Sequence, residues 1–537
     1  MATTARDVVV RWAQRGGRAL IVVGLGVLGL LGALGWESGT TAVGQGASEL
    51  VIGVAKDQYR LEGDAAALGV YPLNANITET LVRLTPDFQI IPWLATSWEY
   101  VGENTWRFSL RRGVKFHNGD EMDAEAVKWS LAKQQRFQPL FPAGEENIRV
   151  VDKYTIEITT RWDFRRVVEA LTHPSYAIYS PKGDPGRNPI GTGPFRLVEY
   201  RQNEVLVVER FADYWNAEEA PRVDRLVFRF VPDGSTRILA LQAGQVDLIV
   251  PVPRENAAAL AQQPGITVYQ APANAYYALY FATKDQVPPY DTLTDPRVRK
   301  AVNYAIDRET IVEQIYSGFA EVAKTLTPPA VLPEVDAGVE GFSFSPERVA
   351  ELLTEAGYTR GADGFWEKDG EPLALTLVSG FPPASIIKPL PEVLQAMLED
   401  QGIRVRLVEF DDIGAYYDYV DTGELHMVIE SGSWNMPDPS FIPFGLFCSC
   451  NTEGEAILYQ RFWINEAFEQ EVMRMVSAED RAEVVEAAVR AAQILVDEFT
   501  GVGPIAYIPN LIAARDEVQG VVVHPAAVHQ RWTGMGK

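Results

Sequence analysis

The sequence predicts an α/β protein with more than one domain, and three observations carry this prediction. The chain has 537 residues, which is too long for one ordinary hydrophobic core. Its composition is globular, with 47% hydrophobic and 22% charged residues. Runs typical of strands alternate with helical patterns, as expected where helices pack on sheets.

Strand signals recur from residue 49 onward. The apolar run ELVIGVA at 49–55 has the length of a strand, and the mature fold is expected to begin there. Similar or alternating runs predict further strands, and an Asn-Gly turn signal ends the segment GVKFHNGD. The further runs are TWRFSL at 105–110, TIEITT at 155–160, RLVFRFV at 225–231, LALTLVS at 373–379, IRVRLVEF at 403–410 and HMVIES at 426–431.

Helix signals are clearest in the middle of the chain. Asp295 is a capping residue followed by proline, and Ser345 begins a second helix in the same way, with Gly357 as its stop. Ser477 with Asp480 predicts a third helix, and STRILALQAG at 235–244 a short one. The expected core-facing residues are Val298, Ala301, Val302, Ala305 and Ile306, then Val349, Leu352, Leu353 and Ala356, then Val485, Ala488, Ala492, Leu495 and Phe499.

The chain is strongly acidic, with a net charge of -24 and a pI near 4.7. Nucleic acid is recognised through basic surface, so we expect no nucleic-acid partner. We interpret the excess of acidic residues as a solvated protein surface.

The N-terminus carries the pattern of an export signal. Four arginines between residues 6 and 18 precede an apolar run from Ala19 to Trp36. That run lies at the length boundary between a cleaved signal peptide and a membrane anchor, and both alternatives stay open. No cysteine follows it, which excludes a lipoprotein anchor. We expect a periplasmic or extracytoplasmic protein that contacts the membrane only through this segment.

No catalytic pattern stands out. The five histidines form no H-x-x-x-H pair, and neither a G-x-S-x-G elbow nor a Walker loop is found. Gly24, Gly26 and Gly29 satisfy G-x-G-x-x-G, but they lie inside the apolar N-terminal run and not between a strand and a helix. We therefore predict no enzyme and no cofactor.

The two cysteines, Cys448 and Cys450, are spaced C-x-C, which we interpret as too close for an easy disulfide. Two thiolates are ligands for a soft metal, and the other interpretation is a pair of small buried residues. We predict no metal site and leave the metal dependence of this pair open.

Six motifs occur in a fixed order along the chain. They are LATSWE at 94–99, TWRFSLRRGVKFHNG at 105–119, PIGTGPF at 189–195, DYW at 213–215, LALQAGQVDL at 239–248 and DPRVRKAVNYAIDRETIV at 295–312. Together they resemble the family 5 extracytoplasmic solute-binding proteins, the peptide- and nickel-binding receptors of ABC importers. The resemblance implies an α/β, two-lobed type II periplasmic-binding-protein fold with an extra subdomain in lobe I.

The resemblance also implies how the chain is divided. Residues 1–47 would be the export signal or anchor, 48–274 lobe I, 275–502 lobe II, and 503–537 the return to lobe I. Within lobe I the extra subdomain would span roughly residues 90–170. The two crossovers are expected near AYYALYFAT at 275–283 and between Gly501 and Tyr507.

The stretch 430–441 is the predicted ligand loop. It leaves a predicted strand at a sheet edge, where clefts of α/β proteins form. The backbone groups of Ser431, Gly432 and Ser433 are expected to bond an extended ligand. Trp434 is either a stacking wall of the cleft or a core residue.

One residue of this loop departs from the family pattern. In peptide-binding members an aspartate three residues before Asp-Pro holds the peptide amine, and here the matching residue before Asp438 is Asn435. A neutral amide does not form the charge-assisted bond of a carboxylate. This departure argues against the family's usual recognition of free peptides, unless an acid elsewhere, such as Glu430, compensates.

Four residues outside the loop complete the predicted site. Adjacent residues of a strand face opposite ways, so one of Tyr276 and Tyr277 is expected in the cleft. Asn74 lies where the family begins its first cleft wall, and His173 is either near the cleft or structural.

The resulting prediction is the substrate-binding component of an ABC importer, which captures an oligopeptide-like solute by hinge closure and delivers it to the permease. The alternatives are a receptor for a nickel or other metal chelate, or for an oligosaccharide. EVAKTLTPPAV at 321–331 and EKDGEPLALTL at 367–377 look similar to the nickel-binding branch. A secreted hydrolase with scattered carboxylates is the alternative from another class.

Overall fold

The computed structural model describes residues 48–55, 75–133, 144–185, 188–284, 286–380, 389–448 and 462–537. The predicted export segment with its three glycines, Asn74 and Cys450 lie outside these residues.

Lobe I is built on a seven-stranded sheet of order β12-β22-β11-β1-β10-β9-β8. The central strand β1 pairs in parallel with β10 and β11, and the remaining pairs are antiparallel. The strands are β1 (Glu49–Val54), β8 (Phe195–Arg201), β9 (Val205–Arg210), β10 (Arg225–Phe230), β11 (Leu248–Val250), β12 (Ile266–Gln270) and β22 (Leu511–Arg515), with helices α6 (Gly234–Gln242) and α7 (Arg254–Ala261). The strands expected near 49–55 and 225–231 are thus confirmed.

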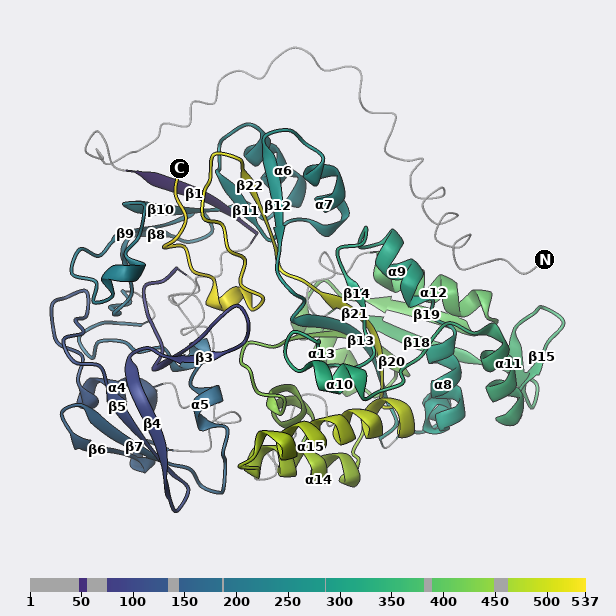
Figure 1. The fold of residues 1–537 in the computed structure, drawn as a ribbon. Coiled ribbons are helices and arrows are strands. Elements are labelled where there is room, and N and C mark those ends of the chain that lie inside the picture. The colour runs from purple at the N-terminus through teal and green to yellow at the C-terminus, as the bar shows by residue number, and fades with distance from the viewer. Residues whose placement is uncertain are drawn as a thin grey trace, which may run out of the picture.

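A separate antiparallel sheet of order β4-β5-β7-β6 forms a subdomain below the lobe I sheet (Figure 1). Its strands are β4 (Ala95–Gly102), β5 (Thr105–Leu110), β6 (Ile148–Asp152) and β7 (Thr155–Thr159), accompanied by α4 (Ala124–Lys133) and α5 (Val167–Ala170). The short pair β2 (Val82–Leu84) and β3 (Ile90–Pro92) leads into it.

Lobe II is built on a six-stranded sheet of order β14-β21-β13-β20-β18-β19. The strands are β13 (Ala275–Phe281), β14 (Glu321–Val322), β18 (Ala374–Ser379), β19 (Arg404–Glu409), β20 (Met427–Ser433) and β21 (Val502–Ile508). The helices are α8 (Pro296–Tyr304), α9 (Arg308–Gln314), α10 (Pro333–Ala337), α11 (Pro346–Glu355), α12 (Leu390–Asp400), α13 (Ile413–Asp421), α14 (Glu466–Ser477) and α15 (Arg481–Gln493). A small sheet of β15 (Thr359–Arg360), β16 (Trp366–Lys368) and β17 (Glu371–Pro372) lies beside α11.

Local capping chemistry explains where the predicted helices begin. The carboxylate of Asp295 accepts a hydrogen bond from the N–H of Arg297 at 2.9 Å, and the hydroxyl of Ser345 accepts one from Arg348 at 3.2 Å. The third predicted start is wrong in one respect, because Asp480 alone caps α15. The Ser477 hydroxyl instead donates to the carbonyl of Met473 at 3.0 Å and ends α14, a helix that the pattern did not predict.

The chain passes from lobe I to lobe II between β12 and β13, and it returns between β21 and β22. The two strands next to these passages, β13 and β21, pair with each other in antiparallel fashion. The passages therefore lie side by side, which is the connectivity that a hinge between two lobes requires.

The motif PIGTGPF packs its backbone directly on another segment of lobe I. A Cβ atom added to Gly193 would lie 2.2 Å from the carbonyl oxygen of Asn76, and the N–H of Gly193 donates to the carbonyl of Ile77 at 2.9 Å. The glycines of this motif are thus required by a close approach of two backbones.

Candidate functional site

The predicted ligand loop begins in the middle of the lobe II sheet. Ser431, Gly432 and Ser433 are the last residues of β20 and pair with Tyr277, Tyr276 and Ala275 of β13. A Cβ atom added to Gly432 would lie 2.5 Å from the Tyr276 hydroxyl, so the tyrosine ring covers this glycine. We call residues 434–448, which follow this strand, the β20 loop.

The other edge of β20 is open beyond Val428 among the described residues, because β18 pairs only with Met427 and Val428. The backbone N–H of Trp434 points toward the β13 side, where it donates to the carbonyl of Asn274 at 3.0 Å. Backbone groups alternate along an antiparallel strand. The N–H and C=O groups of Ser431 and Ser433 are therefore directed toward the open edge.

Trp434 is a core residue in this arrangement. Its side chain is fully buried, its indole N–H donates to the carbonyl of Leu326 at 2.9 Å, and its ring lies edge-on to Phe441 with 6.2 Å between centroids. Of the two alternatives that the sequence left open, the structure therefore shows the buried one. Trp434 holds the base of the β20 loop in place.

Asn435 connects the β20 loop to lobe I. Its carbonyl oxygen lies 2.7 Å from Nε2 of His529, a residue near the C-terminus that follows the lobe I strand β22. A carbonyl only accepts, so this nitrogen carries the proton. Burial lowers the pKa of His529 to about 4, which keeps the imidazole neutral.

His173 also lies at the boundary between the lobes. Its ring is 5.9 Å from that of Phe441 in the β20 loop, and its Nδ1 accepts a hydrogen bond from the N–H of Ser175 at 3.2 Å. Burial, reinforced by the nearby His529, lowers its pKa to about 3. The structure therefore brings His173, Asn435 and His529 into one region, and sequence reasoning missed the last of these.

The tyrosine pair on β13 faces opposite sides of the lobe II sheet, as strand alternation predicts. The hydroxyl of Tyr276 lies 2.9 Å from that of Tyr280, and its ring belongs to the cluster that contains Trp434. Tyr277 stacks on Tyr316 with 6.4 Å between centroids in the opposite cluster. Both side chains are buried.

Two acids beside the loop are buried as well. The Asp438 carboxylate accepts hydrogen bonds from the N–H and hydroxyl of Ser440 at 2.9 and 2.8 Å, and burial raises its pKa. Glu430, the acid suggested as a substitute for a charge at position 435, accepts a hydrogen bond from the hydroxyl of Tyr416.

A buried carboxylate on the lobe I side has no counterpart in the sequence prediction. Glu79 is 1% exposed and lines a cavity of about 20 Å³ together with His529 and Arg531. No local pattern marks it, since its partners come from distant segments of lobe I.

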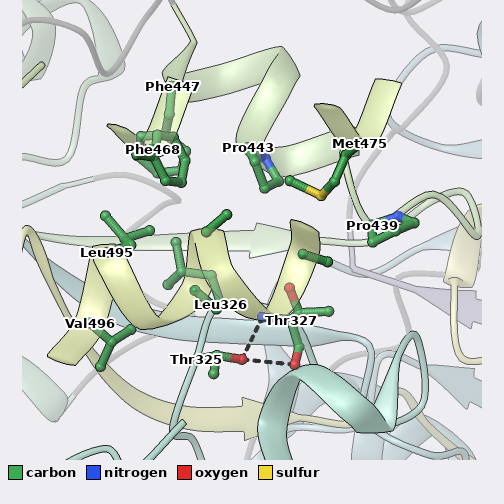
Figure 2. Close-up of a pocket in the computed structure, with 13 residues that line it drawn as sticks. Thr325, Leu326, Thr327, Pro439, Pro443, Phe447, Phe468, Met475, Leu495 and Val496 are labelled. Carbon is green, nitrogen blue, oxygen red and sulfur yellow. Dashed lines mark hydrogen bonds between the residues drawn. The ribbon is translucent and has the colours of Figure 1, made fainter. Parts of the chain in front are cut away.

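A second cavity of about 20 Å³ lies within lobe II, directly beneath the β20 loop (Figure 2). Pro443 of the loop and Met475 of α14 lie next to each other on one side of it, and Leu495 lies on the other side. Its lining is mostly apolar, and the loop therefore rests on the α14–α15 pair without filling all the space.

The interpretation that these cysteines are too close for an easy disulfide is wrong for Cys448, which is disulfide-bonded and buried. Residues two apart already lie within the range of Cα separations that a disulfide spans, so the spacing does not prevent the bond. Among the described residues no group of three or more His, Cys, Asp or Glu side chains is arranged to hold a metal ion. In the same part of the chain, no helix combines the length and apolar character needed to cross a bilayer.

Comparison with known proteins identifies relatives of this architecture. Glutathione-binding protein GsiB of Salmonella choleraesuis (strain SC-B67) is 32% identical over 318 residues, which is 57% of this chain and 58% of that protein. The match thus spans little more than half of that relative. The nickel-binding periplasmic protein of Escherichia coli (strain K12) is 27% identical over 473 residues, or 84% of this chain and 87% of that protein.

The crystal structure of NikA from Brucella suis in complex with Fe(III)-EDTA has a TM-score of 0.79 and 24% identity, covering 91% of this chain and 100% of that one. This likeness confirms the predicted two-lobed type II fold with its extra subdomain. The model of the family described as "Bacterial extracellular solute-binding proteins, family 5 Middle" matches residues 89–454. Because this match covers more than half of the sequence and includes all six ordered motifs, the chain belongs to the family 5 bacterial extracellular solute-binding proteins.

Proposed function

We propose that this chain captures an oligopeptide-like solute between its lobes and presents it to the permease of an ABC importer outside the cytoplasmic membrane. Capture would occur by hinge closure about the paired strands β13 and β21. A solute that contacts both lobes stabilises the closed arrangement through its higher affinity for that state.

The observation that carries the proposal is the open edge of β20 beside the lobe boundary. Ser431 and Ser433 direct backbone donors and acceptors to that edge, while Asn435, two residues further, already contacts lobe I. An extended peptide backbone can add to such an edge as a strand does. Glutathione, the solute named for one relative, is itself peptide-like.

A metal chelate is the second solute class, and the nickel-binding relative favours it. Since the described residues offer no metal-ligand cluster, a metal ion would have to arrive with its own chelator. Asn435 and the neutral His173 suit such a solute better than they suit a free amine.

The proposal predicts that removing one backbone donor at the open edge weakens solute binding. Ser431→Pro removes an N–H that β13 does not use, so binding should weaken about tenfold, the effect of losing one well-placed hydrogen bond. Ser431→Ala keeps the N–H and is the matched control. Calorimetry with glutathione, tripeptides and nickel–histidine complexes, together with native mass spectrometry of co-purified solute, measures the effect.

Equal affinities for Ser431→Pro and Ser431→Ala would contradict strand-like capture at this edge. Failure of every solute in the panel to bind the wild-type protein, with no co-purified mass, would contradict the proposed class of solute.

A further inference from the structure

A set of contacts joins the lobe I subdomain to lobe II. The rings of Trp162 and Phe164 lie 5.6 and 5.9 Å from that of Phe444 in the β20 loop. Next to them, the backbone N–H of Arg165 donates to the carbonyl of Val476 at the end of α14, at 2.9 Å. The subdomain thus contacts both the β20 loop and the helix pair beneath it.

Arg166 lies at the centre of this contact. Its Nη2 donates to the carbonyl of Ala478, between α14 and α15, at 2.7 Å, and its Nη1 pairs with Oε1 of Glu169 at 3.1 Å. Its side chain is only 13% exposed. Its Nε is buried without a hydrogen-bond partner among the described residues.

The positive charge of Arg166 also interacts with Asp438 at the base of the β20 loop. Burial raises the pKa of Asp438 in the loop and of Glu169 in the subdomain, and the guanidinium of Arg166 opposes both shifts. The negative charge of Asp438 in turn raises the pKa of Glu169. One cation therefore stabilises two carboxyl groups that belong to different lobes, the buried Asp438 and the partly buried Glu169.

We propose that Arg166 is a positioning residue for solute capture, which from lobe I holds the base of the β20 loop and the α14–α15 turn of lobe II in the closed arrangement. Opening the lobes would separate Arg166 from the Ala478 carbonyl and from Asp438. This inference rests on the proposed function, because it assumes that the lobes separate to admit a solute.

The consequence is that Arg166 sets solute affinity without touching the solute. When only a fraction of molecules is closed, the apparent affinity falls in proportion to that fraction. A change at Arg166 should therefore alter the affinity for every solute by the same factor, whereas a change at a solute contact alters the affinity for one solute more than for another.

The test measures closure directly, with fluorescent labels on Val198→Cys in lobe I and Val287→Cys in lobe II, both at exposed positions. Arg166→Met should lower the ratio of closed to open molecules about tenfold, since it leaves the Asp438 and Glu169 carboxyl groups without their counter-charge. Arg166→Lys should restore part of the closed population. Arg166→Met combined with Glu169→Gln should also restore part of it, because one uncompensated acid is removed. Arg348→Met, which removes an exposed ion pair with Glu351, is the control and should leave the ratio unchanged.

Two results would overturn the inference. The first is an Arg166→Met protein that opens and closes as the wild type does. The second is a loss of closure that neither Arg166→Lys nor Glu169→Gln restores, which would indicate a loss of packing. If instead the labels in the wild-type protein report one fixed distance with and without glutathione, tripeptides and nickel–histidine complexes, hinge closure fails and the proposed function fails with it.

Discussion

At the scale of single residues, the buried carboxylate of Glu79 in lobe I accepts hydrogen bonds from several side chains at once. Four side chains donate to it: the indoles of Trp93 and Trp215 at 2.7 and 3.0 Å, the hydroxyl of Thr192 at 2.9 Å and that of Tyr214 at 2.7 Å. Arg531 lies 4.0 Å away and also pairs with Glu219. A buried acid with this many donors organises the packing around it.

We therefore expect Glu79→Leu to destabilise the protein by about 3–5 kcal/mol, because it leaves several buried donors unpaired. Glu79→Gln keeps an acceptor oxygen and should cost less. Urea unfolding followed by tryptophan fluorescence measures both changes, with the exposed Glu351→Gln as the control. A loss below about 1 kcal/mol for Glu79→Leu would mean that water or neighbouring groups satisfy these donors.

The residues that were hard to predict share one property: their partners are remote in sequence. Glu79 gathers donors from Trp93 to Trp215, and His529 meets the carbonyl of Asn435. No periodicity or motif encodes such contacts. The stretch around Trp434 was recognisable because it follows a strand and resembles a family motif, yet the burial of its indole depends on Leu326, which only the fold brings near.

At the scale of elements, local sequence signals correctly predicted several strands and helix starts. The strand at 105–110 and the helix capped by Asp295 agree with the structure because alternation and capping act within a few residues. The helix α14 was missed although its signals are local, because its cap, Asn465, precedes a buried stripe at helical spacing that includes Phe468 and Val472. The disulfide of Cys448 was misjudged because spacing alone does not give backbone geometry.

The motif PIGTGPF of lobe I offers a test of whether the close approach of its backbone to that of Asn76 requires glycine. Gly193→Ala would force a Cβ against the carbonyl of Asn76, 2.2 Å away, and the backbone of β8 would have to move. We expect a loss of about 3 kcal/mol or more in the free energy of unfolding, as for other severe overpacking. In Gly534→Ala, the control, the new Cβ meets nothing nearer than 3.7 Å. Equal unfolding midpoints for the two variants would contradict the requirement for glycine.

At the scale of the whole molecule, the sequence-derived division into two lobes depended on the family resemblance. Strand order joins segments as distant as β1 and β22 into one sheet, and β14 and β21 into another. Propensity and periodicity carry no information about such pairings. The interlobe contacts of Arg166 and His529 follow from this topology, which explains why they emerged only with the fold.

The five histidines, four buried and His117 partly buried, should make the stability of the whole molecule depend on pH. Burial lowers the pKa of His117, His426 and His529 to about 4, and that of His173 and His524 to about 3, from an ordinary 6.5. The unfolded chain therefore takes up protons below about pH 6.5, whereas the folded chain stays neutral at these sites until about pH 4. The raised pKa values of Glu169 and Asp438 act in the opposite direction, but they involve two groups against five.

We expect the free energy of unfolding to be highest above pH 6.5 and to fall as the pH decreases toward 4. Each histidine contributes up to about 1.4 kcal/mol per pH unit over that range. Thermal unfolding from pH 7.5 to pH 4.5 should thus show a steadily decreasing midpoint, and urea titrations give the number of protons taken up on unfolding. Replacing one buried histidine, as in His426→Gln, should reduce that uptake at pH 5 by about one proton, even if the variant is less stable at every pH. An uptake near zero in the wild-type protein would mean that the imidazoles are already protonated, or reached by water, in the folded state.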